Sequence, residues 1–383
     1  MKIRVLILIL FAVSNWVTAQ TGYFPPKGTA WEHKEPSSFK VNNNKLRDVV
    51  DFAMENEYSE PRDLRLAIVK SFAHEPYHRL AGPVKERGGP AGLILKNGYI
   101  IAEWGDIDRV DMTFSVTKSY LSTLAGLALN EGLIASVQDK VGEYVWDGTF
   151  RGTHNSKITW HHLLNQSSDW SGQLFGMYDW ADRPPAEGGI DEWKNRTLKE
   201  PGTSFKYNDV RVNVLAYSLL QVWRKPLPQV LKEKVMDPIG ASTTWRWYGY
   251  DHAWVTLDGI SMQSVTGGGH SGGGIFISAR DHARFGLLFL NKGKWNNQQV
   301  IPEQWVSAVQ QPSEANPSYG YMWWLNQGNR AIEGVSNKIY YAAGFGGNFI
   351  IIDKENDVVA VTRWLEPSKF GEFLQLLHNA VKK

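Results

Sequence analysis

Two pairs of apolar segments, placed far apart along the 383-residue chain, restrict the possible folds more than any other feature. In the first pair, GLILKNGYIIAEW (92–104), two apolar runs flank Asn97-Gly98, the dipeptide most typical of a two-residue hairpin turn. In the second pair, NFIIIDKENDVVAVTRW (348–364), the runs flank residues 354–356. Both ends of the chain are therefore expected to supply antiparallel strands.

Apolar residues at helical spacing predict helices before, between and after these hairpins. The segments concerned are 44–56, 116–129, 207–224, 280–291 and 370–383. This order predicts an α+β fold, in which an antiparallel sheet built from both chain ends is flanked by helices and has a mostly helical insert beside it. We expect residues 44–383 to form one domain, preceded by an extended, proline-containing lead-in at 20–43.

The first nineteen residues have the pattern of a cleaved secretory signal peptide. Lys2 and Arg4 precede an apolar run, 5–13, that is too short to cross a bilayer, and residues 17–19 supply the small side chains that signal peptidase requires. We therefore predict a periplasmic or secreted protein with no membrane span after cleavage. Because residues 1–19 hold no acid, their removal takes the formal charge from +2 to zero. The mature chain then lacks the net positive charge that favours binding to nucleic acid.

The stretch FSVTKSY (114–120) places Ser115 and Lys118 one helical turn apart at the start of a strongly apolar helix. In one interpretation, Thr113 or Ser115 caps the helix and Lys118 extends to solvent. In the other, burial lowers the pKa of Lys118, so that its neutral amine takes the proton of a nucleophilic Ser115. A second Ser-x-x-Lys match, at Ser37 and Lys40, lies in the lead-in and is interpreted as coincidence.

Three later segments bear on this choice. Tyr207, in PGTSFKYND (201–209), either shares the serine's proton or is an aromatic residue at the edge of the core. The glycine runs of GGGHSGGGIFISARDHARFG (267–286) lack the Gly-Lys-Ser/Thr of a phosphate loop and favour a pocket wall, with His270 facing the pocket or holding a structural hydrogen bond. YAAGFGGNF (341–349) puts small residues just before a strand, where a substrate has room to lie.

Five segments, taken in their order along the chain, resemble the serine β-lactamase and penicillin-binding-protein superfamily, nearest to its esterase and 6-aminohexanoate-dimer hydrolase branch. They are the first hairpin, FSVTKS, PGTSFKYND, GGGHSGGG and YAAGFGGN. The resemblance covers residues 44–383. It implies that Ser115 is the acyl-forming nucleophile, with Lys118 as its base partner and Tyr207 completing the proton relay. It also implies an oxyanion hole made by the backbone N–H groups of Ser115 and Phe345. The other residues that the resemblance places at the substrate are Ala343, Gly344 and Asp209.

Two positions depart from the family pattern. Asp209 stands where relatives carry an Asn, and an ionised Asp accepts hydrogen bonds but donates none. Ala342 stands where relatives carry the Lys or His that pairs with the carboxylate of a β-lactam. We therefore expect an exported serine hydrolase that cleaves a small-molecule carboxylic ester or amide. A β-lactamase or D-amino-acid peptidase, and a non-catalytic binding or sensing module on the same fold, are the alternatives.

No metal or cofactor is predicted, because the sequence contains neither a cysteine cluster nor a His-Glu-x-x-His motif. The 17 Trp residues are expected mainly in the core, although several of them are candidates for the walls of a substrate cleft. No feature of the sequence indicates an oligomeric state.

Overall fold

The fold is described here from a computed structural model, which covers residues 22–76 and 78–382. The predicted signal peptide, residues 1–19, lies outside the described residues. Within the described ranges, no helix has the length and apolar character needed to cross a membrane.

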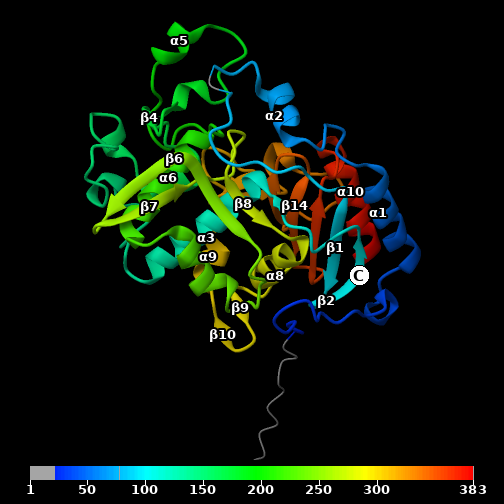
Figure 1. Ribbon diagram of the computed structural model, residues 1–383. Helices are drawn as coiled ribbons and strands as arrows, with labels where there is room; N and C mark the ends of the chain where they lie inside the picture. Colours follow the sequence, from blue (N-terminus) through cyan, green and yellow to red (C-terminus); the bar gives the residue numbers. More distant parts are fainter. Residues whose placement is uncertain (1–21, 77, 383) are drawn as a thin grey trace, which may run out of the picture.

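Both chain ends contribute strands to one seven-stranded antiparallel sheet, as predicted (Figure 1). Its order is β11-β12-β13-β14-β15-β1-β2, so the first hairpin of the chain joins the sheet through the pairing of β1 with the last strand, β15. The turn between β1 and β2 is formed by Asn97 and Gly98, which both have positive φ. The strands are β1 (Ala91–Lys96), β2 (Tyr99–Trp104), β11 (Tyr319–Gly320), β12 (Trp323–Leu325), β13 (Tyr340–Gly344), β14 (Asn348–Asp353) and β15 (Val358–Arg363).

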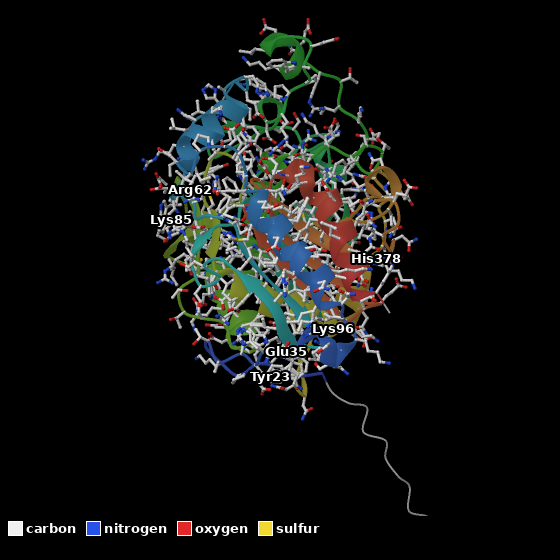
Figure 2. The ribbon with its side chains drawn as sticks, turned by 90° about the vertical axis from the view of Figure 1, so that its right-hand side faces the viewer. Tyr23, Glu35, Arg62, Lys85, Lys96 and His378 are labelled. Carbon is white, nitrogen blue, oxygen red and sulfur yellow. The ribbon has the colours of Figure 1, made fainter. Side chains whose placement is uncertain are left out.

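Every residue of β14 and β15 is buried, because helices cover both faces of the sheet. Helices α1 (Asn43–Glu55) and α10 (Phe370–Val381) lie side by side over one face, which Figure 2 turns toward the viewer. Helix α8 (Ala279–Leu290) covers the other face, where Gly286 lets it approach the side chains of Ile350 and Val359 closely. Strand residues alternate between the two layers, so both layers are apolar.

The part of the chain between the hairpins is less purely helical than predicted. Its helices include α3 (Thr117–Asn130), α4 (Trp160–Leu164), α6 (Asp209–Trp223) and α7 (Leu227–Leu231). It also holds a four-stranded sheet in the order β3-β8-β6-β7. Its strands are β3 (Asp111–Met112), β6 (Arg246–Leu257), β7 (Ile260–Val265) and β8 (Gly274–Ile277). The long β6–β7 hairpin projects from the left of Figure 1, and sequence reasoning missed it even though Asp258-Gly259 forms its turn.

The remaining elements are short or lie at the periphery. They are α2 (Leu64–Phe72), α5 (Ile190–Lys194), α9 (Glu303–Ala308), a π-helical turn at Lys232–Met236, and the strand pairs β4 (Gln173–Leu174) with β5 (Met177–Tyr178) and β9 (Lys294–Trp295) with β10 (Gln298–Gln299).

The lead-in follows the surface and is fixed at several points. The indole of Trp31 is buried and donates a hydrogen bond to the carbonyl of Gly98 in the first hairpin turn. The guanidinium of Arg284, on α8, donates to the carbonyls of Pro25, Pro26 and Gly28. The segment therefore joins the large sheet to the elements beside it.

Candidate active site

Ser115 lies in a strained turn at the start of α3. The turn Phe114–Val116 is a 3-10 helix that runs directly into α3, and Phe114 has φ +48°, a left-handed conformation that is uncommon for a side chain of this size. Two glycines make this turn possible. A Cβ on Gly268 would lie 2.1 Å from the Phe114 carbonyl oxygen, and one on Gly344 would lie 2.2 Å from that of Thr113. Any other residue at either position would push the turn away.

The contacts of Ser115 and Lys118 decide between the two interpretations of the motif. Neither Thr113 nor Ser115 forms a side-chain cap, so the serine hydroxyl is not used by the helix end. Lys118 does not extend to solvent, because its side chain is only 1% exposed. Its Nζ lies 2.8 Å from Ser115 Oγ and 3.2 Å from the carbonyl oxygen of Gly267. The capping interpretation is therefore wrong.

The predicted lowering of the pKa of Lys118 is also wrong. Burial alone works in that direction, but the Asp209 carboxylate lies 2.7 Å from Nζ and outweighs it, so the pKa of Lys118 is raised. The reciprocal effect acts on Asp209. Burial favours its neutral form, yet the charges of Arg183 and Lys118 hold its pKa well below the ordinary value. Lys118 is thus a buried cation at neutral pH, with a hydrogen bond to the serine oxygen.

Tyr207 immediately precedes α6, which begins two residues later than predicted. Asn208 caps this helix, accepting from the amide of Arg211, and its own side chain donates to the carbonyl of Asp179. The ring of Tyr207 lies 5.0 Å from Lys118 Nζ and stacks on Trp324 at 5.8 Å between centroids. The structure thus brings Tyr207 and Asp209 to Lys118 from one turn.

The segment 343–345 lies against the start of α3, at the end of β13. A Cβ on Gly344 would be 3.3 Å from the amide nitrogen of Ser115, which shows how closely the two backbones approach. The ring of Phe345 packs on that of Phe114 at 5.1 Å. Among the described residues, the N–H groups of Ser115 and Phe345 take part in no turn or loop hydrogen bond, so both are available to an oxyanion.

Four charged residues surround Asp209, and of these sequence reasoning connected only His270 with the pocket. Arg183 Nη1 lies 2.8 Å from carboxylate oxygens of both Asp182 and Asp209. His270 lies with Nε2 3.0 Å from Glu75 and Nδ1 3.4 Å from Asp209. Burial disfavours its cation, but Asp209 and Glu75 outweigh this and raise the pKa of His270 to about 9. No local pattern marks these residues, because they come from three separate segments of the chain.

Glu75, Asp182 and His270 are close enough to offer one ligand atom each to a metal ion. A cavity of about 20 Å³ adjoins them. Arg183, however, already bridges the two aspartates. With His270 protonated, three cations (Lys118, Arg183, His270) face three carboxylates (Glu75, Asp182, Asp209). These contacts form a buried ion-pair network, in which burial raises the pKa of Asp182. The sequence-based expectation of no metal at this site stays a prediction.

A pocket of about 350 Å³ opens in front of Ser115. Its walls include Tyr207, Ala343, Gly344, Phe345 and His270, so it gathers most of the residues singled out in the sequence. Of the tryptophans considered as wall residues, Trp324 lines this pocket. Ala342 does not line it and is 1% exposed.

A protein-family model described as Beta-lactamase matches residues 108–363, which is well over half of the chain. The chain belongs to the beta-lactamase family. The nucleophile turn, α6 and the segment 343–345 all fall inside the matched range, so the family assignment covers the predicted catalytic residues. This beta-lactamase-family chain is a serine hydrolase.

Individual relatives are distant but cover most of the chain. It is 23% identical over 324 residues to the 6-aminohexanoate-dimer hydrolase of Paenarthrobacter ureafaciens, a match covering 72% of this chain and 73% of that protein. A penicillin-binding-protein homologue from Caulobacter crescentus superposes with a TM-score of 0.56 at 14% identity, over 83% of this chain and 98% of the other. A family VIII carboxylesterase superposes with a TM-score of 0.55 at 16% identity, over 83% and 96%. The two structures support the fold.

Proposed function

We propose that this protein hydrolyses a carboxylic ester or amide through an acyl-enzyme on Ser115. The observation that carries the proposal is the contact of Ser115 Oγ with the buried Lys118 Nζ at 2.8 Å, at the base of a pocket. A serine is a weak nucleophile unless a neighbouring group stabilises its anion or removes its proton. A fixed cation beside Oγ does the first of these.

Proton removal is assigned to Tyr207. Lys118 is held as a cation by Asp209, so it has no lone pair to accept the serine's proton. The proposed acceptor is the phenolate of Tyr207, whose ring lies 5.0 Å from Lys118 Nζ and 5.2 Å from the Arg183 guanidinium. The sequence-based roles are therefore revised: Lys118 stabilises the serine oxyanion, and Tyr207 carries the proton.

The reaction then follows from the positions of these groups. Oγ bonds to the substrate carbonyl carbon while its proton passes to Tyr207, and the carbonyl oxygen becomes an oxyanion facing the N–H groups of Ser115 and Phe345. The bond to the leaving group breaks, and Tyr207 returns the proton to that group. Water then attacks the ester on Ser115 while Tyr207 takes a proton from the water. Tyr207 passes this proton to Ser115 Oγ as the ester bond breaks, which releases the acid and restores the serine.

An ester or amide is favoured over a β-lactam because Ala342 supplies no cation beside β13. The relatives support this direction, since one is described as a 6-aminohexanoate-dimer hydrolase and another as a family VIII carboxylesterase. A binding module without catalysis would have no need of a buried Lys118 beside an uncapped serine.

Labelling by a fluorophosphonate tests the proposal. The intact mass should rise by one adduct, peptide mapping should place it on Ser115, and Ser115→Ala should lose both the adduct and the hydrolysis of 4-nitrophenyl esters. Ser37→Ala is the matched control, because Ser37 belongs to the other Ser-x-x-Lys match and lies exposed in the lead-in. Equal rates for wild type and Ser115→Ala would favour the binding module.

We also propose that the protein is exported, on the strength of residues 1–19. The same intact-mass measurement, made on protein from its native host, should give a mature chain that starts near Gln20. A retained Met1 would contradict export by this route.

A further inference from the structure

The charges around the active-site pocket are unevenly distributed. Arg183, His270 and Arg330 line it, and no Asp or Glu among the described residues does so. The rest of the wall is mostly aromatic. A pocket of this composition attracts a ligand with apolar surface and negative charge, provided that at least one of its cations is not already neutralised.

Two of the three cations form ion pairs with carboxylates that do not line the pocket. Arg183 is paired with Asp182 and Asp209, and His270 with Glu75 and Asp209. Their carboxylate partners face away from the pocket, since none of them lines it. These two cations therefore hold the wall together and offer little charge to a substrate.

Arg330 is the exception. Among the described residues it forms no ion pair, and it is exposed to solvent at the pocket. Its guanidinium carbon lies 3.8 Å from the ring centroid of Trp324, so the side chain is held flat on that ring. Trp324 in turn stacks on Tyr207. Trp324 thus lies between the Arg330 cation and Tyr207, in the same pocket as the proposed nucleophile Ser115.

We propose that Arg330 binds a carboxylate on the substrate, and that the enzyme acts on esters or amides that carry one free carboxylate at a distance from the scissile bond. This inference rests on the proposed hydrolase function. One N–H of Arg330 is used by the Tyr341 hydroxyl. The other N–H groups of the guanidinium match the two oxygens of a carboxylate. The position differs from that of Ala342, which is buried on β13 and offers no charge.

The number of charges favours a carboxylate over a phosphate ester. Among the described residues, Arg330 is the wall cation without a carboxylate partner, so it can pair with one negative charge on a ligand. A carboxylate carries one negative charge and is neutralised by it, whereas a phosphate monoester carries nearly two at neutral pH. The aromatic walls then pack on the chain or ring between the carboxylate and the reacting carbonyl.

Matched substrate pairs test the inference on both sides of the scissile bond. On the acyl side, mono-4-nitrophenyl esters of straight-chain dicarboxylic acids, from adipate to suberate, are compared with their neutral methyl diesters. On the leaving-group side, 4-carboxyphenyl acetate is compared with phenyl acetate. We expect at least one charged member to have a kcat/KM about tenfold or more above its neutral partner.

Arg330→Gln should remove most of that preference, reducing the charged-to-neutral ratio about tenfold. Arg47→Gln, an exposed arginine on α1 away from the pocket, should leave the ratio at its wild-type value. Calorimetric binding of the preferred half-ester to Ser115→Ala protein, with and without Arg330→Gln, gives a second measure that needs no turnover. Its Kd should rise by a similar factor.

The outcomes separate the two proposals. Ser115-dependent hydrolysis with no preference for charge in any pair, or a preference that Arg330→Gln leaves intact, would overturn the role of Arg330 while keeping the hydrolase. Binding of the half-ester that depends on Arg330, without Ser115-dependent turnover of any ester, would support the carboxylate site and reject the catalytic function. Absence of Arg330-dependent binding would overturn the inference independently of catalysis.

Discussion

Asp209 determines the chemical state of Lys118. Placing an isolated ammonium group in a protein interior costs several kcal/mol, so an unpaired Lys118 would lose its proton. The carboxylate at 2.7 Å reverses this balance and keeps the cation beside Ser115 Oγ. An Asn at this position, as in relatives, would leave the amine to respond to burial alone. In the proposed mechanism, this one of the two departures from the family pattern therefore decides which residue accepts the proton.

Asp209→Asn should move the alkaline limit of activity to lower pH. In the proposed mechanism, the wild type needs protonated Lys118, so its activity is lost only as pH rises through a pKa that is raised. Without the carboxylate, burial lowers that pKa, so the decline of kcat/KM should begin about one pH unit lower or more. The measurement is the pH dependence of kcat/KM on an activated ester.

Asp182→Asn is the matched control, because Asp182 contacts Arg183 but forms no ion pair with Lys118. It should keep the alkaline limit of the wild type. If Asp209→Asn instead raised activity at neutral pH, Lys118 would be the base and the assignment to Tyr207 would be wrong.

At the scale of elements, α3 is packed tightly on all sides. Nearly every residue from Thr117 to Ala128 is buried, and the helix lies close to the middle of Figure 1. At Gly126 the helix backbone lies close to the ring of Trp305, since a Cβ there would lie 2.3 Å from that ring. This packing holds Lys118 in place, because a helix fixed on every side cannot rotate its first turn.

Gly126→Ala should destabilise the protein by about 1–3 kcal/mol, because the clash with Trp305 outweighs the gain of up to about 1 kcal/mol in helix propensity. Gly371→Ala, in α10, has no atom within 4 Å of the new Cβ and should be neutral or stabilising by up to about 1 kcal/mol. Urea unfolding of the two variants measures both. An equal effect in both would show that propensity, and not packing, dominates at Gly126.

The elements that sequence predicted are those with a local pattern. The β1–β2 turn follows from Asn97-Gly98, and α1, α3, α8 and α10 start and end within two residues of the expected ranges. The β6–β7 hairpin was missed although Asp258-Gly259 forms its turn, because many residues of β6 are exposed and its apolar residues form no long continuous run. The ion-pair network had no local pattern, since Glu75, Arg183, Asp209 and His270 meet only after the chain has folded.

At the scale of the whole molecule, the network of charges joins segments from several parts of the chain. His270 comes from the glycine runs before β8, Glu75 from the segment after α2, and Asp209 from the start of α6. Because these contacts form only in the folded chain, His270 binds its proton more tightly there than in the unfolded chain. The stability of the fold is thus linked to pH through this residue.

The raised pKa of His270 determines how the stability of the fold changes with pH. Its contribution to stability should be fully present below about pH 6.5, the ordinary value, and lost as pH rises through about 9. The free energy of unfolding of the wild type should therefore fall across this range relative to that of His270→Gln, by on the order of 3 kcal/mol at most. Urea titrations at several pH values measure the difference. Parallel curves for the two proteins would show that His270 is not charged in the fold.

The strained turn at Phe114 has a consequence for the making of the protein. Its conformation depends on Gly268 and Gly344, and both are translated long after Ser115. A nascent chain that ends before Gly344 therefore carries the serine without the surroundings that hold its turn, and without the N–H of Phe345. The surroundings of the proposed nucleophile therefore form only after residue 345 has been synthesised, so a chain interrupted before that point holds an unactivated serine.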